Sequence, residues 1–224
     1  MTFRFKQFTH KFLDLPELEA TQTPEGRMYQ TPSGVLYPSV TTVIYHRPNE
    51  SLEAWRKRVG EDEANRISTK ATVHGNAIHE LCEHYLLNHK EVIDSLVSKK
   101  RVQLSYLRPI LNNIDNIIGI EQALWSDELK MAGRADCIGE YKGKKSVCDW
   151  KTSNKPKKIE YIQSYFIQGA AYSLMLEERT GEVYDNIVIV VYVESEGRVQ
   201  IFEQPREPYI KALKELVESY WQGR

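Results

Sequence analysis

Hydrophobic and polar positions follow two different periods in the first half of the chain. Up to about residue 45 the chain consists of short extended runs separated by turns, and the Pro-Ser-Gly sequence at 32–34 predicts a β-hairpin. From residue 51 to about residue 118 apolar residues recur at steps of three and four, which predicts helices. Pro109 is expected to kink or restart the last of these helices. Candidate caps for a helix that runs into residues 52–58 are Ser39, Thr41 and Thr42.

The pattern changes at about residue 119. Three strand-like runs follow, separated by polar turns: IEQALWS, MAGRADCIGEY and SVCDWKT. A helix is expected from about Ile159 to Glu178, then the strands NIVIVVYVE and RVQIFEQ, and a last helix after Pro208. We therefore expect one α/β domain over 1–224, with N-terminal strands and helices at 1–118, an α/β core at 119–207 and a C-terminal helix at 208–224.

Composition fits this expectation and narrows the class of protein. A length of 224 residues with 41% hydrophobic and 27% charged residues is typical of one medium globular domain. No apolar run approaches the roughly 18 residues that a membrane-spanning helix needs, so no membrane contact is expected. Thirty Lys and Arg residues against 31 Asp and Glu residues give a net charge of −1. Binding of nucleic acid through bulk positive charge is therefore disfavoured, and a polyanion would need a local basic patch.

The cysteines and the N-terminus indicate a reducing compartment. The chain has three cysteines and no CxxC sequence, which argues against a disulfide framework and a zinc knuckle. The first residues, MTFRFKQFTHKF, are basic, but Phe3 and Phe5 alternate with Arg4 and Lys6 as in a strand, and no apolar signal-peptide core follows. We expect a cytoplasmic protein, with mitochondrial targeting not supported.

Common nucleotide and hydrolase motifs are absent, while a carboxylate–lysine pattern is present. The sequence has no GxxxxGK[ST], GxGxxG, HExxH or GxSxG, which disfavours nucleotide, dinucleotide and serine-hydrolase chemistry. The tripeptide [DE]-x-K occurs at Glu128, Glu140 and Asp149, the first two in or beside polar turns. Asp149 and Lys151 instead end an apolar strand, where alternation places both side chains on one face. A hairpin with the preceding strand can bring Asp136 beside Asp149.

Two carboxylates and a lysine at strand ends suit a hard divalent cation such as Mg²⁺ or Mn²⁺. Such a metal neutralises a scissile phosphate and lowers the pKa of an attacking water, and the lysine stabilises the developing charge. The alternative on these residues alone is a surface ion-pair cluster. No nucleotide cofactor is indicated.

Two helical pairs add to this pattern. His79 and Glu83 lie one turn apart on one helix face, and Gln168 and Tyr172 lie four apart on a later helix. Each has an ordinary alternative: a packed or solvated histidine, and helix packing by Tyr172. A zinc site that uses His79 with nearby helical cysteine and histidine residues is poor, because adjacent helix positions point apart.

In order along the chain, GxxxHxxxE, GRxD, DxK and QxxxY resemble the RecB-type branch of the PD-(D/E)xK nuclease superfamily. The segment LYPSVTTVI, followed by a helix with Trp-Arg-Lys-Arg, is similar to the mitochondrial genome maintenance exonuclease subgroup and its phage relatives. The resemblance covers about residues 37–172. It implies a single nuclease domain with a restriction-endonuclease-like mixed sheet flanked by helices, and metal-dependent cleavage of DNA.

Carried over by position, the resemblance assigns roles to residues of this chain. Catalysis falls to Asp136, Asp149 and Lys151. The implied metal ligands are His79, Asp136, Asp149 and the carbonyl of Trp150. Substrate contacts are expected from Arg134, Lys155, Gln168 and Tyr172, with Glu83 and Glu121 supporting the ligands from behind. Ala135 stands where proline is common, and the four cysteines of some relatives are missing, so no iron–sulfur cluster is expected.

Substrate expectations follow from charge and from the subgroup. Lysines at 142–145 and 155–158 are expected to flank the site and meet phosphates, and Tyr106, Trp125, Trp150 and Tyr165 are candidates to stack on bases. We expect an exonuclease of low sequence specificity that prefers single-stranded DNA with a free end. The alternatives are a structure-selective or restriction-like endonuclease and a DNA-binding accessory protein with a vestigial site. The pathway can be replication, repair, recombination or phage degradation of DNA, with a protein partner in replication or recombination possible.

Overall fold

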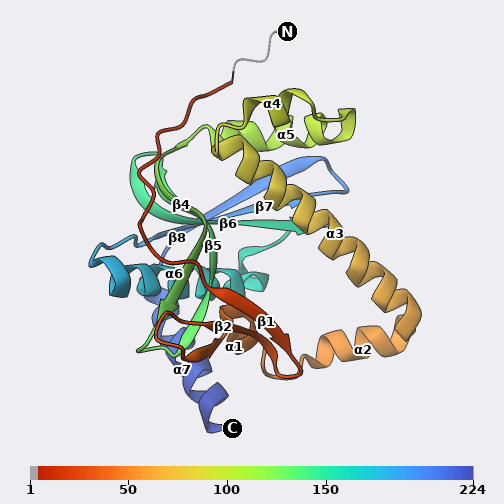
Figure 1. Ribbon diagram of the computed structural model, residues 1–224. Helices are drawn as coiled ribbons and strands as arrows, with labels where there is room; N and C mark the ends of the chain where they lie inside the picture. Colours follow the sequence, from red (N-terminus) through yellow and green to blue (C-terminus); the bar gives the residue numbers. More distant parts are fainter. Residues whose placement is uncertain (1–4, 224) are drawn as a thin grey trace.

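A computed structural model describes residues 5–223, and two sheets form its framework (Figure 1). The smaller sheet contains β1 (Glu19–Thr23), β2 (Gly26–Gln30) and β3 (Leu36–Pro38). The larger sheet has the order β4-β5-β6-β7-β8: β4 (Ile114–Ser126), β5 (Met131–Tyr141), β6 (Lys144–Ser153), β7 (Asn186–Val193) and β8 (Arg198–Pro205). The hairpin expected around residues 32–34 is confirmed as the antiparallel β2–β3 pair.

Helices cover both faces of the larger sheet. They are α1 (Val40–Ile44), α2 (Glu50–Val59), α3 (Glu61–Leu86), α4 (Lys90–Asp94), α5 (Ser98–Leu111), the short 3₁₀ helix η1 (Ile159–Tyr161), α6 (Gln163–Thr180) and α7 (Glu207–Gln222). One apolar cluster joins the sheet to α1, α6 and α7, and a second joins it to α3 and α5 (Figure 1). The expected mixed α/β fold with flanking helices is confirmed. Among the described residues, no helix is both long and apolar enough to cross a membrane.

The topology of the larger sheet follows from its connections. β4, β5 and β6 form an antiparallel meander, β6 and β7 are parallel, and β7 and β8 are antiparallel. Lys142 and Gly143 form the two-residue turn between β5 and β6, with φ of 51° and 77°. Positive φ at both turn residues is the type I′ geometry that suits the twist of a hairpin. α6 provides the crossover that a parallel β6–β7 pair requires.

The prediction that helical structure continues to about residue 118 is wrong. α5 stops at Leu111, shortly after Pro109, and β4 begins at Ile114. Ile114 and Ile117 are buried three residues apart, which imitates a helical period. In the structure this spacing arises from an irregularity of the β4–β5 register between Asp115 and Gly119. An extra residue in a strand shifts the alternation of its side chains, so a bulged strand can carry a helix-like apolar pattern.

Two N-terminal expectations also change. Ser39 does cap a helix, since its hydroxyl accepts the backbone N–H of Thr42, but that helix is α1 and ends at Ile44. α2 starts separately with Asn49 as its cap, because Pro48 disfavours helical geometry in the residue before it. The strand alternation expected over residues 3–6 falls largely on residues 1–4, which lie outside the described part. Further along, His10 forms an isolated bridge with Ile117.

Candidate active site

Three neighbouring strands of the larger sheet bring three carboxylates together. Residue pairs on either side of Glu121 and Asp136 place them opposite each other between β4 and β5. The Cys137–Cys148 pair places Asp136 beside Asp149 between β5 and β6, as the hairpin argument predicted. Asp136 is 8% exposed and Asp149 is 1% exposed. Buried carboxylates this close together require nearby positive charge or protons.

Lys151 supplies positive charge from the same strand as Asp149. Its Nζ donates a hydrogen bond to Oδ1 of Asp149 at 2.6 Å and lies 2.5 Å from Oδ2 as an ion-pair contact. Burial lowers the pKa of Lys151, but the charges of Asp149 and Asp136 raise it more, so the net shift is upward. The lysine is therefore held as an ammonium group that faces the carboxylates.

His79 approaches the carboxylates from α3. Its Nδ1 lies 3.5 Å from Oδ1 of Asp136 and 3.9 Å from Oε1 of Glu121. α3 passes close to the end of β6 at Gly75, where an added Cβ would lie 3.7 Å from Oγ1 of Thr152. In the described part of the chain, only His79, Glu121 and Asp136 form a group of three potential metal ligands, with ligand atoms within 4.8 Å of one another. One imidazole and two carboxylates form a donor set that fits Mg²⁺ or Mn²⁺.

The surroundings shift the pKa of His79 and Asp136 upward. Burial lowers the pKa of His79, but the hydrogen bond with Glu121 and the charge of Asp136 raise it by more. The net result is a pKa of about 9. Burial and the charge of Asp149 raise the pKa of Asp136 to about 7, partly offset by His79 and Lys151. The Trp150 N–H donates to Oδ2 of Asp136 at 2.7 Å. Without a metal, His79 and Asp136 therefore tend to hold protons. A bound cation would lower the pKa of both groups.

We expect the affinity for Mn²⁺ to rise with pH. His79 (pKa about 9) and Asp136 (pKa about 7) must release protons before they can bind a metal, so protons compete at low pH. Between about pH 6.5 and about pH 8.5 the dissociation constant should fall roughly tenfold per pH unit for each proton displaced. Isothermal titration without DNA, in buffers of different ionisation enthalpy, measures both affinity and proton release. An affinity that does not change with pH would contradict this account.

Gln168 and Tyr172 lie on α6, and both line a cavity next to His79 and Asp136. Nε2 of Gln168 lies 3.5 Å from the Tyr172 hydroxyl, and both side chains are buried. Burial holds the pKa of Tyr172 well above its usual range, so its hydroxyl stays a hydrogen-bond donor. Tyr172 lies against Gly133 of β5, where an added Cβ would come within 2.9 Å of Cε1. This glycine of the GRxD sequence allows α6 to approach the strand that carries Asp136.

Arg134 and Lys155, both expected at the substrate, lie in different surroundings. Arg134 lines the cavity, but its guanidinium donates to the Glu121 carbonyl at 2.9 Å and pairs with Glu17 at 2.6 Å. It thereby holds the main chain of Glu121, whose φ of 48° is unusual for a residue with a side chain. Lys155 is exposed in the segment after β6 and is not among the residues that line the cavity. Glu83 lines the cavity beside His79.

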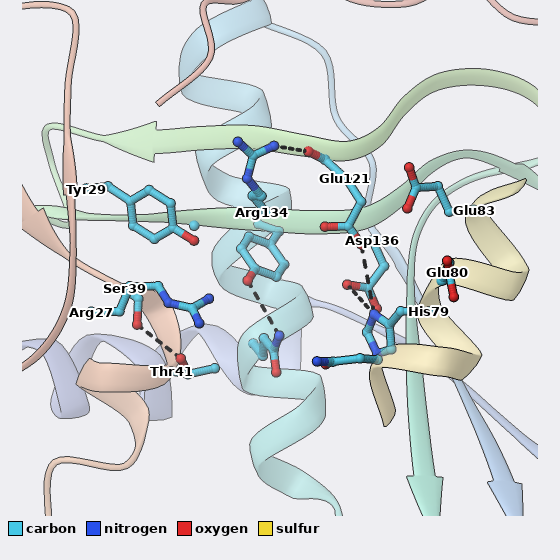
Figure 2. Close-up of a pocket in the computed structure, with 14 residues that line it drawn as sticks. Arg27, Tyr29, Ser39, Thr41, His79, Glu80, Glu83, Glu121, Arg134 and Asp136 are labelled. Atoms are coloured by element: carbon cyan, nitrogen blue, oxygen red, sulfur yellow. Dashed lines mark hydrogen bonds and ion pairs between the residues drawn. The ribbon is translucent and has the colours of Figure 1, made fainter. Parts of the chain in front are cut away.

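His79, Glu121 and Asp136 line a cavity of about 400 Å³ with two different walls (Figure 2), whereas Asp149 and Lys151 are not among the described residues that line it. Acidic residues and His79 form one wall, and Arg27, Tyr29, Ser39 and Thr41 form the other. Sequence reasoning missed this second wall as part of the site, although Ser39 and Thr41 stood out as helix caps. It also missed Asn76 and Glu80, which line the cavity from α3. The single available indication was that both lie within the GxxxHxxxE segment.

Two expectations about the surroundings of the site are wrong. Lys144 and Lys145 lie at the turn of the β5–β6 hairpin, away from the carboxylates, and pair with Glu203 and Glu182. The rings of Trp125 and Trp150 are 8% and 2% exposed, so they are core residues and cannot stack on bases. Tyr165 remains a candidate, because its ring centroid lies 5.4 Å from Nζ of Lys151. The three cysteines are buried and free, as expected.

Sequence comparison relates the chain to named exonucleases. It is 30% identical over 183 residues to human mitochondrial genome maintenance exonuclease 1, covering 76% of this chain and 49% of the relative. The mouse protein of the same name is 26% identical over 180 residues, covering 76% of this chain and 50% of the relative. The chain thus spans about half the length of these relatives. No protein-family model matches the sequence.

Structural comparison gives a weaker likeness. A crystal structure from Eubacterium rectale, named as a proposed exonuclease, matches with a TM-score of 0.46 and 15% identity, over 66% of this chain and 64% of that one. The order of motifs and the relatives in sequence are the stronger observations. They support a nuclease of the PD-(D/E)xK type that is similar in sequence to the mitochondrial genome maintenance exonucleases.

Proposed function

We propose that this chain is a metal-dependent DNA exonuclease that uses Mg²⁺ or Mn²⁺ and prefers single-stranded DNA with a free end. The observation that carries the proposal is the convergence of His79, Asp136, Asp149 and Lys151 at one end of the β5–β6 hairpin. The proposal treats the chain as a single nuclease domain. Low sequence specificity is part of it, since no recognition helix or other base-reading module stands out among the described elements.

The chemistry is divided among the residues of the site. We assign metal binding to His79, Asp136, Asp149 and the Trp150 carbonyl, with Glu121 near enough to take part. A divalent cation held there would neutralise charge on the scissile phosphate and acidify a water molecule. Uncatalysed phosphodiester hydrolysis is very slow, so stabilisation of developing negative charge is the main requirement.

The ammonium group of Lys151 is placed to stabilise that charge. Asp149 fixes it through a 2.6 Å hydrogen bond, and its raised pKa keeps it protonated. Gln168 and Tyr172 are then available to hold the DNA backbone, with Arg134 and Lys155 as further candidates for contact. Glu83 lies beside His79 in the cavity wall and can orient it.

The selectivity for free ends is supported by the connection between the two cavity walls. β2 and α1 carry one wall, α3 contributes to the other, and the segment that joins α1 to α3 contains α2. No residue of α2 is buried, and the helix stands away from the sheet (Figure 1). Its last turn carries Arg56, Lys57 and Arg58. A basic arm that joins the walls favours a strand that enters by its end over one that enters from the side.

A comparison of linear and circular single-stranded DNA tests the proposal. We expect degradation of the linear strand with Mg²⁺ or Mn²⁺, no degradation with EDTA, and none with Asp149→Asn. The circle of the same sequence should stay intact, because it offers no end. Cleavage of the circle would favour an endonuclease that uses the same site. Binding of both DNAs without hydrolysis would favour an accessory protein.

The biological setting follows only from the relatives. Their names place them in maintenance of the mitochondrial genome. The cytoplasmic location and a partner in replication or recombination therefore stay predictions, as does a role in repair or in phage metabolism.

A further inference from the structure

Two arginines line the cavity, and the protein already binds the side chain of one of them but not that of the other. Arg134 is engaged by Glu17 and by the Glu121 carbonyl. Arg27 also lines the cavity, and its guanidinium makes no ion pair or hydrogen bond within residues 5–223. Figure 2 shows it directed into the cavity beside Ser39. Of these two arginines, Arg27 is the one whose positive charge is available to a ligand.

The main chain of Arg27 is firmly placed. Its carbonyl accepts the N–H of Ser39 at 2.8 Å, and its own N–H donates to Oγ1 of Thr42 at 3.2 Å. Arg27 also pairs with Gln22 in the β1–β2 ladder. An arginine on a fixed backbone loses less conformational freedom on binding than one on a mobile loop. The side chain is thus presented to the cavity from a rigid position.

Hydroxyl groups surround Arg27 on the same wall. Tyr29 is 3% exposed, and its hydroxyl makes no hydrogen bond within the described residues. The residue is thus mostly buried, and since Tyr29 lines the cavity its hydroxyl is left to bind a ligand or solvent there. Thr41 is exposed, and its hydroxyl is held 3.0 Å from that of Ser39. The wall therefore offers a guanidinium and two hydroxyl donors, opposite the acidic wall (Figure 2).

This arrangement matches a phosphate group next to the one that is cleaved. Arginine binds phosphate through two parallel hydrogen bonds, and hydroxyl groups can donate to further lone pairs of the same anionic oxygens. We propose that Arg27, Tyr29 and Thr41 form a phosphate-anchoring subsite that holds a DNA phosphate adjacent to the scissile one. The proposal rests on the nuclease function proposed above. The phosphate is either an internal phosphodiester or a terminal monophosphate, which share the same anionic oxygens.

Binding measurements in a background that cannot cleave test the subsite. The background is Lys151→Gln, which leaves all proposed metal ligands in place, and the probe is a dye-labelled single-stranded oligonucleotide followed by fluorescence anisotropy with Mg²⁺. Adding Arg27→Gln should weaken binding by roughly 10- to 100-fold. The slope of log affinity against log salt should become shallower by about 0.7. Arg27→Lys should recover part of the loss, because it keeps the charge and loses the paired hydrogen bonds.

A matched control and two further oligonucleotides complete the test. Arg198→Gln removes an exposed arginine that pairs with Glu196 at the start of β8, and it should leave affinity and salt slope unchanged. A loss confined to 5′-phosphorylated or 3′-phosphorylated strands identifies a terminal phosphate, whereas an equal loss on all strands identifies a phosphodiester. Unchanged affinity and slope for Arg27→Gln would overturn the subsite alone. If the Lys151→Gln background itself fails to bind DNA, the nuclease proposal and the subsite fall together.

Discussion

Replacement of Lys151 by glutamine is expected to reduce DNA cleavage by about 10²- to 10³-fold, the loss seen when one charge-stabilising donor is removed from an active site. Lys151 holds an ammonium group against Asp149 at 2.6 Å, within electrostatic reach of Asp136 in the cavity wall. Glutamine is preferred to alanine, since its amide can still donate to the buried carboxylate. Single-turnover cleavage of labelled linear DNA, with saturating Mg²⁺, measures the effect on the chemical step.

The chain contains its own matched control. Glu128 and Lys130 repeat the [DE]-x-K tripeptide in an exposed turn, so Lys130→Gln should cleave DNA at the rate of the unmodified protein. Loss of Lys151 also leaves the charge of Asp149 without its ion pair, which destabilises a protein. The double variant Asp149→Asn with Lys151→Gln should regain thermal stability and remain inactive. Equal activity of Lys151→Gln and Lys130→Gln would show that the buried pair is structural.

Asp136→Asn is expected to abolish Mn²⁺ binding and cleavage while raising the melting temperature of the metal-free protein. Burial and the charge of Asp149 raise the pKa of Asp136 to about 7. A carboxyl group with a raised folded-state pKa stabilises the fold at low pH, and this contribution is lost as pH rises towards about 7. Above that pH the ionised group opposes folding, and asparagine removes the charge while still accepting the Trp150 N–H.

Thermal melts without metal at about pH 5 and about pH 8.5 measure this difference. The variant should gain roughly 3 °C at the higher pH, which corresponds to about 1 kcal/mol for a protein of this size, and less at the lower pH. Mn²⁺ should raise the melting temperature of the unmodified protein and leave that of the variant unchanged. A variant that still responds to Mn²⁺ like the parent would remove Asp136 from the metal site.

The sequence predicted much of the fold where local pattern decides structure. The strands that became β5 and β6 are apolar runs bounded by polar turns, and the hairpin between them follows from a short polar turn. The start of β4 was missed, because the bulge after Asp115 gives Ile114 and Ile117 a helical spacing. The break between α1 and α2 was also missed, although Pro48 marks it. In both cases a local backbone feature, a bulge or a proline, outweighed the periodicity of its neighbours.

The residues of the site likewise fall into those that local sequence predicts and those that depend on the fold. His79, Asp136, Asp149 and Lys151 lie in short local motifs, so their types and spacing were sufficient to select them. The position of Glu121 opposite Asp136 depends on the strand register and on a backbone angle that glutamate rarely adopts.

No sequence motif indicated that Arg27 and its neighbours form a wall of the cavity. It comes from packing of the small sheet and α1 against β5, where Val40 lies near Gly133. Contacts of that range leave no periodic trace in the sequence.

Because side chains alternate along β6, the site also depends on whether the number of residues between the hairpin turn and Asp149 is odd or even. Asp149 and Lys151 point to one face, while Cys148 and Trp150 are buried in the cluster beneath α3 and α5. One residue inserted between the hairpin turn and Asp149 would exchange these two sets, driving a carboxylate and an ammonium group into the apolar cluster. A two-residue insertion would keep the faces and displace the acids along the sheet. Most residues near the ends of β6 can therefore change, but the length of the strand is as tightly constrained as the proposed catalytic residues.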